Sequence, residues 1–337
     1  MAIIRDIMPA FELFQPANTD DAVALLSKYG KDAWPMAGGL DTFDWLKDRI
    51  KRPKVVVDLS QVKDLTGIRP LNGGLEIGAM TTLTEVVRHP EVRKNFSILS
   101  TGAENAASPQ IRNQGTLGGN VSQDARCWYY RGGWKCYRAG GNTCYADTPT
   151  AINREHAILH ADRCVAVNPS DSAPALIALD AQMVIRNSGG ERVVNAEDYF
   201  VGPDIDIQRL TVLRPGDLLT AIRIPSTWAG STFYFEKVRD RQVWDFPLVN
   251  VASAAVFSGG NIQKIRIAVN GVAARPLRLK EVEDAITGKP RNEATAAMGA
   301  EIAIRGAEPL RYNGYKIPLM RNLVKRSIRG VEEAKWA

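Results

Sequence analysis

The four cysteines of this 337-residue chain could hold a redox metal centre, because all of them lie in one stretch and none occurs elsewhere. Eight residues separate the first from the second, seven the second from the third, and nineteen the third from the fourth: Cys127, Cys136, Cys144 and Cys164. Four thiolates are the usual complement of one [4Fe-4S] cluster, and an irregular segment can surround such a cluster. The cysteines therefore predict one iron–sulfur site.

Three other states of these cysteines stay open on spacing alone. Structural zinc also takes four cysteines, but its sites usually contain pairs roughly two to four residues apart. No such pair occurs here. Two disulfides would suit an exported protein. Buried free thiols are the last possibility, although the confinement of every cysteine to one segment argues against random placement.

Two glycine-rich turns could bind the phosphates of a cofactor. The first spans residues 35–41 and the second residues 108–120, with Gly-Gly pairs at 38–39 and 118–119. Glycine lets the backbone approach a ligand closely, and successive amides at such a turn form an anion-binding nest. A Gly-Gly pair is more often a tight turn that binds nothing, so neither turn is diagnostic alone. Neither matches the dinucleotide fingerprint or the Gly-Lys-Ser/Thr phosphate loop, which disfavours a Rossmann fold.

The stretch from Cys127 to about Asn153 has no helical or strand period and is rich in Gly, Tyr, Trp and Arg. An irregular loop of this length inside a compact domain is usually functional or disordered. Its aromatic residues predict a hydrophobic lid that shields a cluster from water: Trp128, Tyr129, Tyr130 and Trp134. The nearby His156 and His160 are interpreted as packing residues around the loop rather than as a metal pair.

Alternating helices and strands must position these residues. Asp20–Tyr29 reads as a capped helix and residues 42–50 as a second one, while the apolar runs at 55–57 and 75–79 read as strands. Beyond the cysteines, 165–167 reads as a strand, 172–179 as a helix and 181–186 as a strand that enters a Gly-Gly turn.

The region from Pro225 to Gly230 is the best candidate for a domain boundary, because the order of elements changes beyond it. Strands are predicted at 233–238, 249–257 and 264–272, and helices at 279–287, 293–305 and 319–334. This part therefore reads as an α+β domain, a sheet packed by helices.

Composition limits the remaining possibilities. The net charge of +6 arises from interspersed rather than clustered charges, which disfavours nucleic acid as a partner. The longest apolar stretch, residues 248–257, is interrupted by two polar residues and is far shorter than the ~20 residues of a membrane span. Residues 1–16 carry acids and a proline, so no export signal is expected.

Taken in order, several motifs resemble the FAD-binding subunit of molybdenum hydroxylases. They are Ala-Gly-Gly at 37–39 with a following Asp, the stretch 77–85, the turn 108–120, Pro-Ser-Asp at 169–171, and Phe-Glu-Lys-Val-Arg-Asp-Arg at 235–241. The resemblance runs over essentially the whole chain. It implies an α+β fold with a two-subdomain FAD-binding domain of the PCMH/vanillyl-alcohol-oxidase type over residues 1–225, split near 60. An iron–sulfur loop at 122–164 is inserted in it, and a smaller α+β domain of the CO-dehydrogenase-flavoprotein type follows at 231–337.

The resemblance also implies which residues contact FAD. The first turn supplies Met36, Ala37, Gly38, Gly39, Leu40 and Asp41, and the second supplies Asn113, Thr116, Gly118, Gly119 and Asn120. Thr81, Asp171 and Lys237 are further cofactor-binding positions. Leu40 departs from the family pattern, where a threonine or similar small polar residue is common, and a lost hydroxyl contact there would weaken but not abolish the phosphate site.

The implied function is electron transfer. Flavin subunits of periplasmic aldehyde oxidoreductase and of 4-hydroxybenzoyl-CoA reductase insert a loop that binds [4Fe-4S] after the same motif, and the cysteine arrangement here is more similar to the aldehyde branch. The resemblance implies a large molybdopterin-binding subunit, a small [2Fe-2S] subunit and an external electron acceptor as partners. The chain would be cytoplasmic, or periplasmic by co-export with a signal-bearing small subunit.

Alternatives are a subunit of a xanthine dehydrogenase-like or 4-hydroxybenzoyl-CoA reductase-like complex, or a non-catalytic FAD or iron–sulfur assembly protein. A stand-alone flavin oxidase of the vanillyl-alcohol type would normally bring its own substrate cap, for which the C-terminal part is short.

Overall fold

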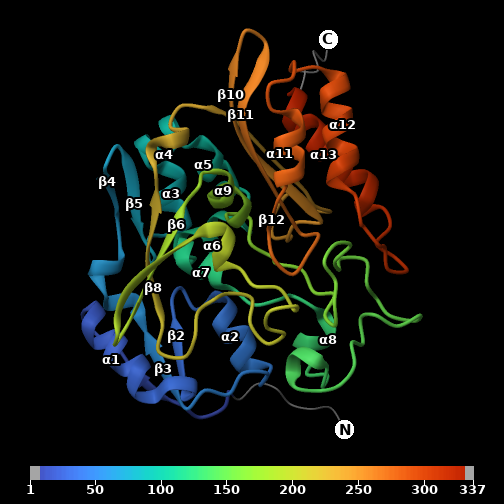
Figure 1. Cartoon of the computed structure of the whole chain (residues 1–337). Helices are drawn as coiled ribbons and strands as arrows, with labels where there is room; N and C mark the ends of the chain where they lie inside the picture. The colour runs from blue at the N-terminus through green and yellow to red at the C-terminus, as the bar shows by residue number, and fades with distance from the viewer. Residues whose placement is uncertain (1–7, 331–337) are drawn as a thin grey trace.

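The computed structural model describes residues 8–330, and its strands form three sheets that follow one another along the chain. Figure 1 shows the small N-terminal sheet in blue at the bottom, the central sheet above it, and the C-terminal sheet with its red helices at the upper right. This mixture of separate sheets and helices confirms the predicted α+β class.

The N-terminal sheet is parallel, in the order β1-β3-β2, because a helix lies between successive strands. Its elements are β1 (Glu12–Phe14), α1 (Thr19–Tyr29), β2 (Ala33–Met36), α2 (Leu40–Lys47) and β3 (Val55–Asp58). The helix α1 begins where the side chain of Asn18 accepts the amide of Asp21. The predicted strand at 55–57 is confirmed as β3, which is buried along its whole length.

The central sheet is antiparallel, in the order β4-β5-β8-β6-β7. Its strands are β4 (Ile68–Leu71), β5 (Gly74–Gly78), β6 (Gln182–Asn187), β7 (Gly190–Asn195) and β8 (Leu218–Ile224). Since the chain leaves this sheet after β5 and returns at β6, the second glycine turn and all four cysteines are inserted between two parts of one sheet. The inserted helices are α3 (Leu83–Arg88), α4 (Pro90–Asn95), α5 (Ser97–Glu104), α6 (Pro109–Gln114), α7 (Leu117–Ser122), α8 (Trp128–Arg131) and α9 (Ala173–Ala178).

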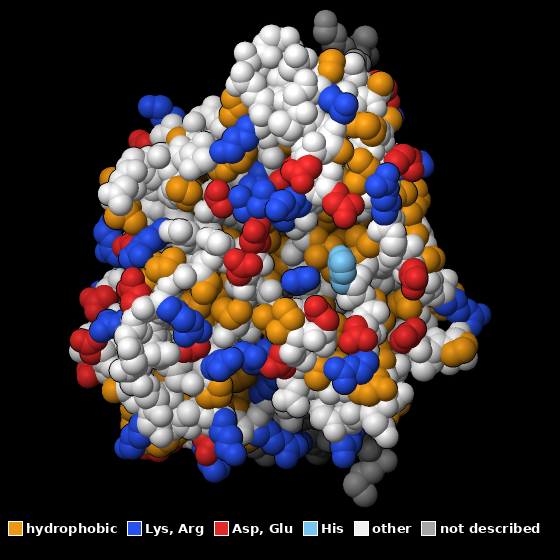
Figure 2. All heavy atoms as spheres, in the orientation of Figure 1, with side chains coloured by type: hydrophobic (Ala, Val, Ile, Leu, Met, Phe, Trp, Pro, Cys, Tyr) orange, Lys and Arg blue, Asp and Glu red, His pale blue; other side chains and the backbone are white. Residues whose placement is uncertain are grey.

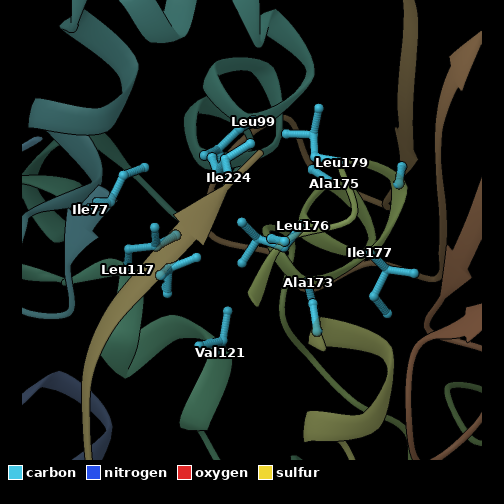
Figure 3. Packing of buried hydrophobic residues seen from close by; sticks show 14 of the residues in the cluster. Ile77, Leu99, Leu117, Val121, Ala173, Ala175, Leu176, Ile177, Leu179 and Ile224 are labelled. Atoms are coloured by element: carbon cyan, nitrogen blue, oxygen red, sulfur yellow. The ribbon is translucent and has the colours of Figure 1, made fainter. Parts of the chain in front are cut away.

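The main hydrophobic core surrounds α9, whose six residues are all buried. Figure 3 shows Leu176 of α9 in one cluster with Leu117 of α7 and Ile224 of β8. The same cluster includes Ala252 and Ala268 of the C-terminal sheet, so the inserted region and the C-terminal part share one core. The short helix α10 (Ala196–Tyr199) adds the buried Tyr199 to it.

The C-terminal sheet is antiparallel in the order β12-β11-β10-β9 and is covered by three helices. Its elements are β9 (Thr232–Val238), β10 (Val249–Ser258), β11 (Asn261–Asn270), β12 (Leu277–Arg278), α11 (Lys280–Ile286), α12 (Glu293–Ala303) and α13 (Lys316–Arg329). The three predicted strands and three predicted helices are thereby confirmed. The last helix begins three residues earlier than predicted, and positions 331–334 of the prediction lie outside the described residues.

The segment between α7 and α9 is largely irregular, as predicted, with α8 and the 3-10 turn Tyr137–Ala139 as its helical pieces. The other 3-10 turns are Gly30–Asp32, Leu59–Gln61, Lys63–Leu65 and Ser226–Trp228. The prediction of a strand at 165–167 is wrong. The carbonyl of Val165 accepts a hydrogen bond from the amide of Ala157 (2.8 Å), and the amide of Asn168 donates to the carbonyl of Ala273 (3.0 Å). This buried stretch therefore bonds to two separate irregular segments and does not pair with another strand.

Figure 2 shows basic and acidic side chains intermixed over one face of the molecule, as the interspersed charges of the sequence predict. Within residues 8–330, no helix combines the length and the apolar character that a membrane crossing requires.

Candidate functional site

The first glycine turn connects β2 to α2 and leaves a row of backbone amides without a partner. Gly39 occupies the left-handed region (φ 76°) and precedes α2 without capping it by a side chain. Among the hydrogen bonds of the described residues, none uses the amides of residues 37–41 as donors. Unpartnered amides at the N-terminus of a helix form an anion site, because they point outward and the helix dipole adds partial positive charge.

The second glycine turn packs directly against the first. A Cβ atom at Gly38 would overlap the carbonyl oxygen of Gln114, and the side chain of Gln114 donates to the carbonyl of Gly38 (2.7 Å). A Cβ atom at Gly119 would lie 3.5 Å from that of Ala37 and 3.0 Å from the hydroxyl of Thr116. The glycines therefore allow the two turns to approach each other, a role that the sequence interpretation did not assign to them.

The amides of the second turn are already used within the chain. Leu117 donates to the carbonyl of Thr81 (2.9 Å), Gly118 to that of Ala79 (2.9 Å) and Gly119 to the hydroxyl of Thr116 (3.0 Å). In this structure the second turn therefore supports the first and offers few amides to a phosphate. The backbone contacts predicted for Thr116, Gly118 and Gly119 remain predictions.

Three further predicted residues also brace this region. Thr81 is fully buried, and its hydroxyl donates to the carbonyl of Gly67 (3.0 Å). Asn113 accepts the hydroxyl of Thr84 (2.7 Å). Asn120 accepts the hydroxyl of Ser170 (2.6 Å), which connects the second turn to the segment that carries Asp171.

Asp171 and Lys237 form a buried ion pair at the junction with the C-terminal sheet. The ammonium group of Lys237 donates to the carboxylate of Asp171 (2.7 Å) and to the carbonyls of Asn105 (2.9 Å) and Asp245 (2.7 Å). Burial raises the pKa of Asp171 to about 6, and the positive charge of Lys237 opposes this shift. All three donors of Lys237 are thus used inside the protein, so both residues have a structural role here. Their predicted contact with a cofactor stays a prediction.

This pair leads to a prediction about stability. Lys237→Met should lower the free energy of unfolding by about 3–5 kcal/mol, because it leaves the carboxylate of Asp171 buried without its partner. Thermal or denaturant unfolding measures the loss. The control is Arg154→Met, which breaks the exposed pair with Asp240 and should cost about 1 kcal/mol or less. Equal losses in the two variants would contradict a special role of the buried pair.

The carboxylate of Asp41, at the start of α2, is held by the cysteine segment. Arg126 and Arg131 both donate to one of its oxygens, and the indole of Trp45 donates to the other (3.0 Å). The guanidinium of Arg131 also lies over the ring of Trp45, at 3.9 Å. The sequence interpretation missed both arginines, and their position on either side of Cys127 was the only available signal.

A cavity of about 680 Å3 opens beside α2 and the cysteine segment, within the size range of cofactor pockets. Its walls include Asp44 of α2, Asp48 directly after α2, Arg126 and Arg131, and the stretch 244–248 that precedes β10. The lining also includes Glu155, Asp240 and Asp245 but none of residues 36–41, so the cavity itself is not an anion site. The unpartnered amides at the start of α2, together with the two guanidinium groups that Asp41 binds, are suited to an anionic group such as a pyrophosphate. These residues therefore fit a flavin nucleotide.

The four cysteines form no disulfide, and Cys127 packs against the apolar clusters that contain Cys164 and Cys136. Burial raises the pKa of Cys127 to about 12, and thiolates at Cys164 and Cys144 would raise it further. Burial likewise raises the pKa of Cys164, on which Cys144 and Cys136 act in the same direction. Within residues 8–330, no three or more His, Cys, Asp or Glu side chains are placed to hold a metal ion. The predicted ligand set thus remains a prediction.

The side chains around the thiols differ in part from the predicted lid. Tyr130 is buried against Trp45, with ring centroids 5.3 Å apart, whereas the side chain of Trp128 is 67% exposed. His156 is buried, lies outside any helix and contacts the sulfur of Cys127 through Nε2 (3.2 Å). Burial lowers the pKa of His156 to about 4, so its ring is neutral at physiological pH.

Two family models match the chain. Residues 9–227 match the FAD binding domain in molybdopterin dehydrogenase, and residues 233–331 match the CO dehydrogenase flavoprotein C-terminal domain. Together they cover nearly all of the described residues.

Similar proteins of known function agree with these matches. The medium chain of carbon monoxide dehydrogenase from Hydrogenophaga pseudoflava is 29% identical over 98% of this chain and 99% of its own length. The aldehyde oxidoreductase FAD-binding subunit PaoB from Escherichia coli is 33% identical over 82% of this chain and 86% of its own length.

The fold agrees as well. A solved structure of the Hydrogenophaga pseudoflava carbon monoxide dehydrogenase superimposes with a TM-score of 0.76 at 27% identity, covering 95% of this chain and 96% of the other. The chain belongs to the family of FAD-binding medium subunits of molybdenum hydroxylases, and it is an oxidoreductase subunit.

Proposed function

We propose that this chain carries FAD at the two packed glycine turns and transfers electrons from its partner subunits to an external acceptor. The single observation that carries the site is the row of unpartnered amides at residues 37–41 before α2. Bound flavin supplies the redox chemistry, since it accepts two electrons and releases them singly or as a hydride. The residues of the chain hold and orient it.

Each predicted residue has a defined part in this proposal. Met36 to Asp41 form the turn that receives the pyrophosphate, and Thr116 to Asn120 hold this turn in place from the other side. Asn113 and Thr81 support the second turn, while Asp171 and Lys237 fix the position of the C-terminal sheet beside it. Leu40 lies in this turn with no hydroxyl to offer, and its side chain packs near Gly115.

We further propose that Cys127, Cys136, Cys144 and Cys164 bind a [4Fe-4S] cluster. The proposal is supported by the packing of Cys127 against two apolar clusters, one that contains Cys164 and one that contains Cys136. Cluster ligands are spread over a cuboid rather than around one ion, and hydrogen bonds to sulfur tune the potential. His156 is placed to make such a bond to Cys127.

The complex that we propose contains a large molybdopterin-binding subunit and a small [2Fe-2S] subunit, and it oxidises aldehydes. The aldehyde class is supported by the similarity to PaoB and by the cysteine segment, which resembles that branch of the family. Other relatives have names that refer to carbon monoxide, nicotine or nicotinate, so the substrate is the least constrained part of the proposal. We place the complex in the cytoplasm, or in the periplasm if the small subunit exports it.

Anaerobic purification of the intact complex, followed by flavin, iron and molybdenum analysis and a substrate screen, tests this proposal. One FAD per chain, iron bound to this chain, two co-purifying subunits and turnover of an aldehyde are expected. Absence of flavin would contradict the site, and turnover of an aldehyde by this chain alone would contradict the division of labour. Activity only on a purine, an acyl-CoA or carbon monoxide would replace the aldehyde class.

A further inference from the structure

The helix α2 is a shared wall between the proposed flavin site and the cysteine segment. The unpartnered amides of residues 37–41 lead into its first turn, which contains Asp41, the residue to which Arg126 and Arg131 donate. One turn further along, Trp45 is buried against Tyr130 of α8. Arg126 and Arg131 lie on either side of Cys127 in sequence, so these contacts of α2 reach the peptide that carries the first cysteine.

The arginines at this helix remove the repulsion that Asp41 would otherwise exert on an anion. A lone carboxylate at the start of α2 would repel a pyrophosphate, but two guanidinium groups share the carboxylate of Asp41 and offset its negative charge. Asp44, further along α2, also acts on Arg126, so these four groups together carry no net charge. The side chains of Asp41 and Arg126 are only 25% and 28% exposed, so solvent screens these charges incompletely. The carboxylate thereby holds two cations beside the unpartnered amides.

The segment that these contacts hold has few other regular bonds. The helix α8 is only four residues long, and Arg131 and Gly132 donate to Cys127 and Trp128 within it. A second anchor lies on both sides of this peptide, where Asp124 before it pairs with the buried Arg138 after it (2.9 Å) and with Lys51 (3.2 Å). Lys51 also donates to the hydroxyl of Tyr130 (2.7 Å). Loss of the Asp41 contacts would therefore loosen residues 126–134 without releasing the whole segment.

We propose that Asp41 is a positioning residue that couples flavin binding at the start of α2 to the order of the first cysteine peptide, residues 126–134. This inference rests on the proposed function, because it takes FAD as the anion that binds there. An anion that fixes the first turn of α2 also fixes the carboxylate that Arg126 and Arg131 bind. Thermodynamic linkage is reciprocal, so ordering of this peptide strengthens FAD binding by the same factor by which bound FAD favours the ordered peptide.

Hydrogen exchange in the full chain without metal, measured with and without saturating FAD, tests the coupling. In the wild type, FAD should slow exchange of the amides of residues 131–134 by about 5- to 150-fold, the range of typical coupling between sites. In Asp41→Asn the effect should fall below about twofold, within the error of independent sites. Asp41→Glu keeps the charge and should restore part of the protection.

The matched control is Asp20→Asn, which removes an aspartate–arginine pair between α1 and β6, remote from α2. It should leave the protection of residues 131–134 by FAD unchanged. Protection that persists in Asp41→Asn, or that disappears equally in Asp20→Asn, overturns the coupling. A wild type that binds FAD without slowing this exchange overturns the coupling alone, whereas a wild type that binds no FAD overturns the flavin site as well.

Discussion

The variant Gly38→Ala is expected to lose most of its bound FAD while it keeps its fold. The added methyl group would overlap the backbone carbonyl of Gln114, which cannot move as a flexible side chain can. The two glycine turns must then separate, and the row of amides before α2 changes its position. Overpacking of this kind costs about 1–3 kcal/mol. Because FAD binding requires the closed arrangement, its affinity should fall about 10- to 100-fold.

Flavin content after purification and FAD titration by fluorescence measure this loss. Gly119→Ala should have a smaller effect, since its methyl group would meet only the side chains of Thr116 (3.0 Å) and Ala37 (3.5 Å). Gly314→Ala is the matched control, because its nearest neighbour would be a side-chain atom at 3.8 Å. Wild-type affinity in Gly38→Ala would show that the contact between the turns does not shape the flavin site.

The location of the glycine turns could be predicted from the sequence, but it could not be predicted that the first offers free amides and the second supports it. Both turns have the same local pattern, and local pattern determines that a turn forms there. What distinguishes them is the environment: the amides of Leu117 and Gly118 meet carbonyls of the stretch 79–81, whereas those of residues 37–41 meet none in the described chain. These partners are remote in sequence, so no local motif reports them.

The same limit applies to charged residues. Asp171 and Lys237 lie in motifs that resemble the family, and their tight pairing across 66 residues depends on how α9 packs on the C-terminal sheet. Asp41 is separated by 85 residues from Arg126 and by 90 from Arg131. Apolar periodicity predicted α1, β3 and the C-terminal elements because it reports burial directly. The same signal failed at 165–167, where a buried apolar run has no neighbouring strand.

The variant Cys136→Ser should lose the iron–sulfur cluster and keep FAD. Serine has nearly the same shape as cysteine but lacks the thiolate that iron–sulfur clusters require. Cys136 is buried in a cluster with Trp45 and Tyr130, so the substituted side chain lies where the cysteine segment packs against α2. About four irons per chain, beyond those of the partner subunits, should disappear. The unpartnered amides of residues 37–41 belong to a different loop, so most of the flavin should remain.

Iron and sulfide analysis, with EPR after reduction by dithionite, compares this variant with Tyr145→Phe. That control lies next to Cys144, keeps the ring that packs on Trp134 (4.8 Å between centroids) and retains every thiol. It should hold a full cluster. Because metal binding contributes folding free energy to an irregular segment, proteolysis within residues 135–164, beyond the peptide that Asp41 holds, should accelerate in Cys136→Ser and not in Tyr145→Phe. Unchanged iron in Cys136→Ser, or zinc in place of iron in the wild type, would exclude the four-cysteine cluster without affecting the flavin site.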